Sequence, residues 1–227
     1  MIGTTPNSDL GRAAIAYREI KRRITELVYK PGDKLSEVRI ASELGFGRSP
    51  VRTAFSRLQS EGWIEISPQS GTFVRGLSDD EITEILETRM VLESHLAGLA
   101  AKKITQTELI QLRAAFSAFG KRVSSDRLDA YLELDLQFHL AVYKAAGNQL
   151  IAGILINLID KIRWIRRASV GSPSRIQDAF NEIYAVLEAL EKHDSRAASA
   201  AMRVHIVNAL EFRRNKKIPD KKEIVSR

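Results

Sequence analysis

Two short helix patterns on either side of a tight turn constrain the fold of this chain more than any other feature. Ser36 can cap a helix over residues 37–44, which glycines then end. Ser49 and Pro50 provide a second start signal, because serine caps helices and proline favours the first helical position. The apolar spacing that follows predicts a second short helix, ending before Gly62.

A longer helix precedes this pair and a β-hairpin follows it. Apolar residues recur at helical spacing over residues 12–29. After the second short helix, residues 63–67 alternate like a strand, residues 68–71 have turn chemistry, and residues 72–74 read as a returning strand. Three helices and a hairpin in this order predict a winged helix-turn-helix domain at residues 1–76.

The rest of the chain reads as helical. Glycine, asparagine, proline and serine signals separate six predicted helices, at 79–103, 105–124, 126–146, 149–170, 173–192 and 195–216. Helices of this length can form an antiparallel bundle with its own core. The predicted fold class is therefore mainly α, with the winged domain, an all-helical bundle domain at 77–215 and a basic tail at 216–227.

Composition narrows the classes of protein and of site. The net charge of the 227 residues is +7, with the basic excess at the two ends of a nearly neutral middle, which favours contact with a polyanion. The chain has no cysteine, so any metal must use His, Asp or Glu. No secretory signal pattern or membrane-length apolar run is present, so we expect a cytoplasmic protein without a membrane partner.

A helix-turn-helix places its second helix in the DNA major groove, so that helix should carry donors near its start. Arg48, Ser49 and Arg52 have this placement, and Arg39 lies near the start of the preceding helix. The arginine fork can bind guanine O6 and N7 together, and backbone N–H groups at a helix start can bind a phosphate. Each arginine alone reads as an ordinary surface charge. Their arrangement around the turn favours DNA contact.

The predicted hairpin offers a second contact to DNA at Gly71 and Thr72. Glycine has no side chain, which lets the backbone come close to a phosphate or to the minor groove. Arg75 is a weaker candidate beside them. We therefore expect the hairpin to act as the wing of the DNA-binding domain.

Four stretches in this region carry a family resemblance: Pro31 to Leu35, Leu44 to Arg52, Leu58 to Gly62, and Gly71 to Val74. Together they resemble the winged-helix domain of the GntR transcription regulators, over about residues 12–76. The resemblance implies that five residues contact operator DNA, with Gly71 at the minor groove: Arg39, Arg48, Ser49, Arg52 and Gly71.

The chain departs from the GntR pattern at two positions in the turn and the helix after it. Gly47 stands where the family usually has serine, which removes a phosphate donor. Thr53 replaces a common glutamate. We expect these differences to shift the operator preference.

Four polar side chains interrupt the apolar stripes of the predicted bundle. Asp135 and His139 are four residues apart on one helix and therefore share a face. His205 falls in the apolar stripe of the last helix, and Arg89 in that of the first. Polar groups in a core are costly unless paired, so these residues are candidates for a functional site. The alternative is that they only satisfy one another's hydrogen bonds.

Residues 79–215 resemble the FCD effector domain of the fatty-acid-regulator-like branch of GntR proteins. The motifs that carry this resemblance are residues 89–93, 135–139, 147–148 and 201–205. Many such domains bind a divalent metal with one Asp and three His, and a carboxylate effector completes the coordination. The resemblance implies that Asp135, His139 and His205 hold an ion such as zinc.

One ligand of that pattern is missing. The third histidine would fall 22 residues before His205, and that position is Ile183. Loss of an imidazole should weaken metal binding. The sequence therefore allows two alternatives, a pocket with a bound metal and a pocket without one. In the metal-free pocket Arg89 is the main anchor for an anionic effector, and Arg163 is the second candidate.

The predicted function is a ligand-responsive regulator that binds double-stranded operator DNA as a homodimer and represses until a small carboxylate binds. One alternative is a helical metal-dependent enzyme that uses the Asp–His–His group with Glu133 or Glu182 as a base. No phosphate loop or nucleophile elbow supports an enzyme. Another alternative is a dimeric DNA-binding protein with a filled core and no ligand, a hypothesis that Ile183 favours.

Overall fold

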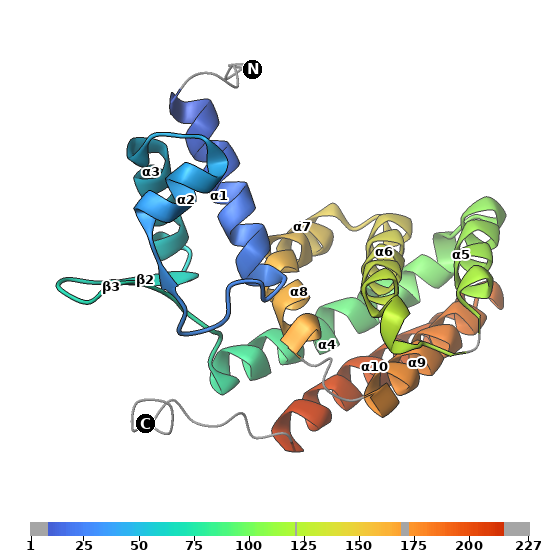
Figure 1. Ribbon diagram of the computed structural model, residues 1–227. Coiled ribbons are helices and arrows are strands. Elements are labelled where there is room, and N and C mark those ends of the chain that lie inside the picture. Colours follow the sequence, from blue (N-terminus) through green and yellow to red (C-terminus); the bar gives the residue numbers. More distant parts are fainter. Residues whose placement is uncertain (1–8, 121, 169–172, 216–227) are drawn as a thin grey trace. The chain divides into compact units, whose positions relative to one another are not determined.

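A computed structural model describes residues 9–120, 122–168 and 173–215 of the chain. The fold is mainly helical with one small sheet after the N-terminal helices, which confirms the predicted fold class (Figure 1). Contacts divide the chain into two compact units, residues 1–77 and 78–227. The predicted basic tail lies outside the described residues. Across the described ranges, the helices are too short or too polar to cross a membrane.

The first unit consists of three helices and a three-stranded antiparallel sheet. Its helices are α1 (Asp9–Thr25), α2 (Glu37–Leu44) and α3 (Arg48–Ser60). Its strands are β1 (Lys34–Leu35), β2 (Ile64–Ser67) and β3 (Gly71–Val74), in the order β1-β3-β2. The two-residue strand β1 was not expected from the sequence, because two residues are too few to show an alternating pattern.

Apolar faces of α1 and α3 form the core of this unit. Ile20 and Ile24 of α1 are buried, as are Val51, Phe55 and Leu58 of α3, and these two helices pack on each other. The spacing of these residues, three or four apart, gives each helix one apolar face.

Two helix boundaries differ from the prediction. Helix α1 ends at Thr25, not at residue 29, because Leu27 adopts a left-handed conformation (φ 57°) that stops the helix. Helix α3 begins at Arg48, with Gly47 as its N-cap, so Ser49 lies within the helix and is not the predicted cap. The predicted caps of α2 are confirmed: the Ser36 side chain accepts a hydrogen bond from the Arg39 N–H.

The second unit contains seven α-helices and a short 3-10 turn among the described residues. They are α4 (Asp79–Lys103), α5 (Gln106–Phe119), η1 (Ser125–Arg127), α6 (Leu128–Ala146), α7 (Gln149–Asn157), α8 (Ile159–Ala168), α9 (Pro173–Glu191) and α10 (Ser195–Asn215). The prediction of one helix over 149–170 is wrong, because the chain breaks at Leu158 between α7 and α8. The prediction of a helix to residue 124 is also wrong: α5 stops at Phe119, before Gly120 with φ 83°.

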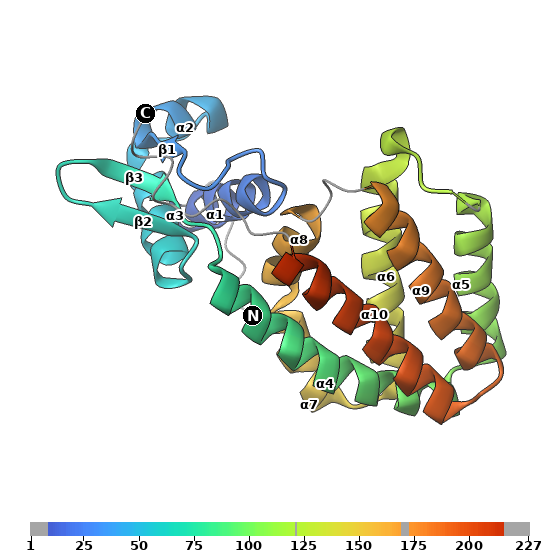
Figure 2. The same ribbon diagram turned by 90° about the horizontal axis from the view of Figure 1, so that it is seen from below.

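Helices α4 and α10 run antiparallel and pack along most of their length (Figure 2). Ser195, at the start of α10, donates a hydrogen bond to the Gly98 carbonyl, 2.7 Å away, near the end of α4. Arg214, near the end of α10, pairs with Glu87, near the start of α4. Helices α6 and α9 pack against this pair, α6 on α4 and α9 on α10. Polar residues on α4, α6 and α10 therefore face one interior.

Candidate functional site

The arginines predicted to contact DNA lie on the surface of the first unit. The Arg39 side chain is 79% exposed and pairs with Glu43 on the same helix at 2.8 Å. The Arg52 side chain is 68% exposed and pairs with Glu37 of α2 at 3.1 Å. Arg48 is also exposed. Exposed ion pairs contribute little to stability, so Arg39 and Arg52 can exchange their carboxylate partners for another anion at small cost.

The start of α3 has no side-chain cap. Its N-cap residue, Gly47, offers no side-chain acceptor to the first turn, and both Arg48 and Ser49 are exposed there. The first-turn N–H groups of a helix have no partner within the helix. An anion at this point would meet backbone donors as well as the Arg48 side chain.

The wing differs from expectation at Thr72. Thr72 is only 9% exposed, because it lies in the central strand β3, opposite Leu35 of β1 and Ile66 of β2. The Thr72 side chain is therefore not available for contact with DNA. Gly71 has φ 114°, a conformation that favours glycine, and a Cβ there would lie 2.7 Å from the Cε atom of Lys34.

Asp135, His139 and His205 meet inside the second unit. Asp135 and His139 lie one turn apart on α6, and His205 lies on α10; all three residues are at most 5% exposed. One ligand atom from each side chain lies within 4.8 Å of the other two. The Nε2 atom of His139 is 3.7 Å from Oδ1 of Asp135. The group of three predicted from spacing and family resemblance therefore forms one buried cluster, called here the Asp–His–His cluster.

Each member of the Asp–His–His cluster has a charged partner outside it. Glu93 of α4 contacts the Nδ1 atom of His139, and Glu182 of α9 lies 2.9 Å from the Nδ1 atom of His205. Arg166 of α8 pairs with Oδ2 of Asp135 at 2.9 Å. These contacts leave the Nε2 atom of His139 buried without a hydrogen-bond partner among the described residues.

The charges around the cluster shift the pKa values of its acids. Burial alone would raise the pKa of Glu93, but the Arg89 and His139 charges lower it well below the usual value. Burial also opposes ionisation of Asp135, yet the charge of Arg166 dominates and lowers the Asp135 pKa. Burial lowers the pKa of His205. At neutral pH both acids are ionised, and His205 is held in the neutral form that binds metals.

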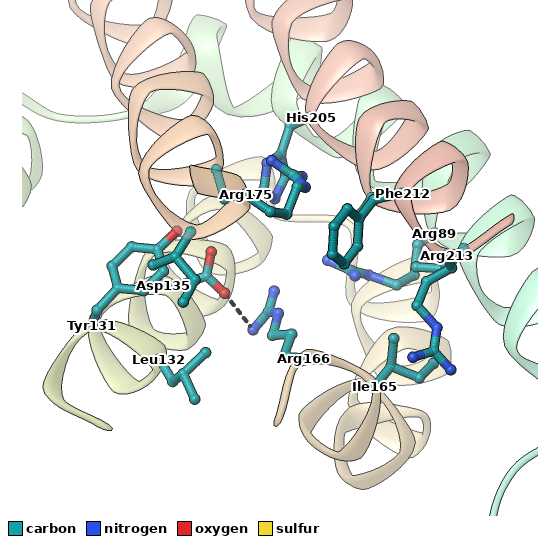
Figure 3. A pocket seen from close by; sticks show the side chains of 14 residues that line it. Arg89, Tyr131, Leu132, Asp135, Ile165, Arg166, Arg175, His205, Phe212 and Arg213 are labelled. Carbon is teal, nitrogen blue, oxygen red and sulfur yellow. Dashed lines mark ion pairs between the residues drawn. The ribbon is translucent and has the colours of Figure 1, made fainter. Parts of the chain in front are cut away.

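A small pocket opens beside the Asp–His–His cluster (Figure 3). Its cavity is about 80 Å³, enough for several water molecules or a small acid. The polar side chains that line it are Arg89, Tyr131, Asp135, Arg166, Arg175, His205 and Arg213. Carboxylates pair with three of the four arginines, so the site keeps an excess positive charge, which suits an anionic ligand.

Comparison with known proteins identifies both units. Residues 13–74 match the family described as bacterial regulatory proteins of the gntR family, and residues 84–208 match the FCD domain. The chain belongs to the GntR family. The GntR regulator is therefore a DNA-binding transcriptional regulator and not an enzyme, which removes the alternative of a metal-dependent hydrolase or lyase.

Individual relatives agree with this assignment. The HTH-type transcriptional repressor RspR of Escherichia coli is 30% identical over 193 residues, 84% of this chain and 83% of that protein. The Exu regulon transcriptional regulator of Escherichia coli is 31% identical, covering 84% and 80%. A GntR regulator from Rhodococcus has a similar fold, with TM-score 0.73, 18% identity, and 91% and 99% coverage.

Of the two arginines predicted to hold the effector of this GntR regulator, only Arg89 lines the pocket. Arg89 lines the pocket: it is 2% exposed, its Nε lies 2.6 Å from Glu93, and its Nη2 has no hydrogen bond among the described residues. Arg163 does not line the pocket, and its side chain is 49% exposed and lies 3.9 Å from Glu133. On α8 it is Arg166, three residues further along the helix, that lines this pocket and pairs with Asp135.

Several site residues were not found from the sequence. The Arg89–Glu93 pair could have been predicted, because Glu93 lies four residues after Arg89 and therefore on the same helix face. The sequence named Glu182 only as a base of the alternative enzyme, and Arg166 gave no signal. Their contacts with the cluster depend on how helices distant in sequence pack. Ile183 is fully buried in the apolar core and supplies no ligand, as expected from its side chain.

We predict that Glu93→Gln destabilises the second unit by about 3 kcal/mol or more, because removing one partner leaves the buried Arg89 charge uncompensated. Urea unfolding followed by circular dichroism measures this change.

The matched control is Glu87→Gln, on the same helix, which breaks the exposed pair with Arg214 and should change stability by under about 1 kcal/mol. Equal effects of the two substitutions would show that the Arg89–Glu93 pair does not support the core.

Proposed function

We propose that this GntR regulator binds operator DNA as a homodimer in the bacterial cytoplasm and represses transcription until a small carboxylate enters the pocket. The observation that carries the proposal is the pairing of an exposed, arginine-bearing α3 with a buried basic pocket in one chain. The cavity also counts against the alternative of a filled bundle that serves only for dimerisation.

The DNA contact rests on α3 and the turn before it. Arg48 and Arg52 lie four residues apart on an exposed face of α3, and Arg39 extends from α2. Placed in the major groove, these side chains supply forked donors for guanine edges, while the uncapped start of α3 meets a phosphate. Gly71 brings the wing backbone close to the adjacent groove.

Two copies of this arrangement would read a pseudo-palindromic operator, which is the reason for proposing a homodimer. Release by a ligand then requires that the ligand bind more tightly to the form with lower DNA affinity. Repression is proposed by analogy with RspR, whose name describes that protein as a transcriptional repressor.

The Asp–His–His cluster fits a divalent ion such as zinc. Carboxylates hold the Nδ1 atoms of His139 and His205, which leaves both Nε2 atoms for a metal, and Arg166 holds the second oxygen of Asp135. Such outer partners usually orient metal-ligating histidines. The Nε2 atom of His139 is buried without a hydrogen-bond partner among the described residues, and a bound metal would be its partner. A bound ion would supply a Lewis acid for effector oxygens, and Ile183 leaves one more position open to them than a third histidine would.

The effector is proposed to be a small carboxylate. Buried donors of the pocket without hydrogen bonds among the described residues point to an oxygen-rich anion. They are Nη2 of Arg89, the Tyr131 hydroxyl, both Nη atoms of Arg166 and Nη2 of Arg213. The small cavity favours a short acid over a long acyl chain. In the absence of metal, Arg89 and Arg166 would hold the carboxylate directly.

Replacing Arg48 or Arg52 by alanine should weaken operator binding about 10- to 100-fold, because each removes about 1–3 kcal/mol of base or phosphate contact. Fluorescence anisotropy measures this, using a duplex selected from a random library by the wild-type protein at fixed salt.

The matched control is Arg22→Ala, which removes an exposed, ion-paired arginine from α1 and should change affinity little. Wild-type affinity in both α3 variants would exclude α3 as the recognition helix.

We expect the protein, purified without chelators, to hold about one divalent ion per chain, and the His139→Ala variant to hold none. Elemental analysis measures the ratio, and Ile183→His should bind zinc more tightly than wild type by restoring a fourth ligand.

His193→Ala is the control, since His193 bonds the Ala101 carbonyl outside the cluster and its loss should leave the metal content unchanged. If the wild-type protein holds no metal, the metal proposal is wrong and the Asp–His–His cluster would contact the effector directly.

A further inference from the structure

Arg213 is a buried cation without a counterion in the described part of the chain. It lies on α10, is 9% exposed, and lines the pocket. Its Nη2 atom is buried without a hydrogen bond, and no carboxylate of the described residues lies within ion-pair distance. Burial lowers the pKa of Arg213, and the charge of Asp79, at the start of α4, opposes this shift.

The neighbouring Arg214 shows the contrast. Its side chain is 57% exposed and pairs with Glu87 at 3.2 Å. An arginine keeps its charge throughout the physiological range. A charge that is both buried and unpaired destabilises the folded protein. We therefore expect an anion from outside this part of the chain to bind beside Arg213.

The other arginines of the pocket already face carboxylates. Arg89 pairs with Glu93, Arg166 with Asp135, and Arg175 with Glu182. In Figure 3, Arg166 lies between Asp135 on one side and Arg213 on the other. The pocket thus has one polar end at the Asp–His–His cluster and a second, uncompensated positive end at Arg213.

We infer that the effector carries two anionic groups and is a short dicarboxylate: one carboxylate at the Asp–His–His cluster and Arg166, the other at Arg213. The second carboxylate also accepts a hydrogen bond from Arg89 in the same pocket, at its Nη2 atom, which has no hydrogen bond among the described residues. Apolar side chains also line this pocket, among them Leu86, Ile165 and Phe212, and they suit a short methylene chain. This inference rests on the proposed carboxylate effector and specifies its class.

The test compares dicarboxylates with matched monocarboxylates. Malonate, succinate, glutarate and adipate, and the monocarboxylates of equal carbon number, are titrated into the wild-type protein by calorimetry and scored by thermal shift at millimolar concentration. We expect at least one dicarboxylate to bind at least about tenfold more tightly than its monocarboxylate, because only the dicarboxylate satisfies Arg213.

Arg213→Met should reduce that ratio to about one while leaving monocarboxylate binding in place. It should also raise the melting temperature of the ligand-free protein, because it removes an uncompensated buried charge. The matched control is Arg214→Met, one residue further along α10, which should preserve the dicarboxylate preference.

Three results would overturn the inference. Equal binding of dicarboxylates and monocarboxylates to the wild type would reject the second anion position and keep the proposed carboxylate effector. A lower melting temperature of ligand-free Arg213→Met would show that the chain itself supplies the counterion. Binding of none of the acids would reject the carboxylate effector, and the inference with it.

Discussion

Charges inside a protein need opposite charges beside them, since the low-dielectric interior makes an isolated charge costly. In the helical unit this constraint produces one chain of contacts: Arg89 to Glu93, Glu93 to His139, His139 beside Asp135, and Asp135 to Arg166. This series of contacts links α4, α6 and α8 and fixes the directions of the side chains involved. The position of the Asp–His–His cluster, and the basic pocket next to it, follow from these pairs.

Helix α4 gives this pocket a covalent connection to the DNA-binding unit. It begins directly after the boundary between the units, where Ser78 and Glu81 form a capping box that fixes its first turn. Three turns later the same helix carries Arg89, which lines the pocket, and then Glu93, which pairs with Arg89. A ligand that changes the contacts of Arg89 therefore acts on the helix that continues from the wing. This continuity is the physical basis for proposing that one site regulates the other.

Local signals were sufficient for the winged domain and for part of the site. Caps and turn residues predicted its helices and its hairpin, and the spacing of Asp135 and His139 predicted their shared face. The role of Arg166 could not be predicted, because it depends on the break at Leu158 that sets the rotation of α8. The same break determines that Arg163, the arginine named from the sequence, lies outside the pocket lining. Contacts between helices distant in sequence leave no local pattern, so only packing reveals them.

We propose that an acid in the pocket controls operator binding. The most direct measurement is the anisotropy of a selected operator duplex titrated with protein, with and without each acid that binds. We expect at least about a fivefold loss of operator affinity with one of these acids, within the usual range of allosteric coupling, and no loss in the Arg166→Met variant. Unchanged operator affinity with every acid that binds the pocket would contradict this proposal.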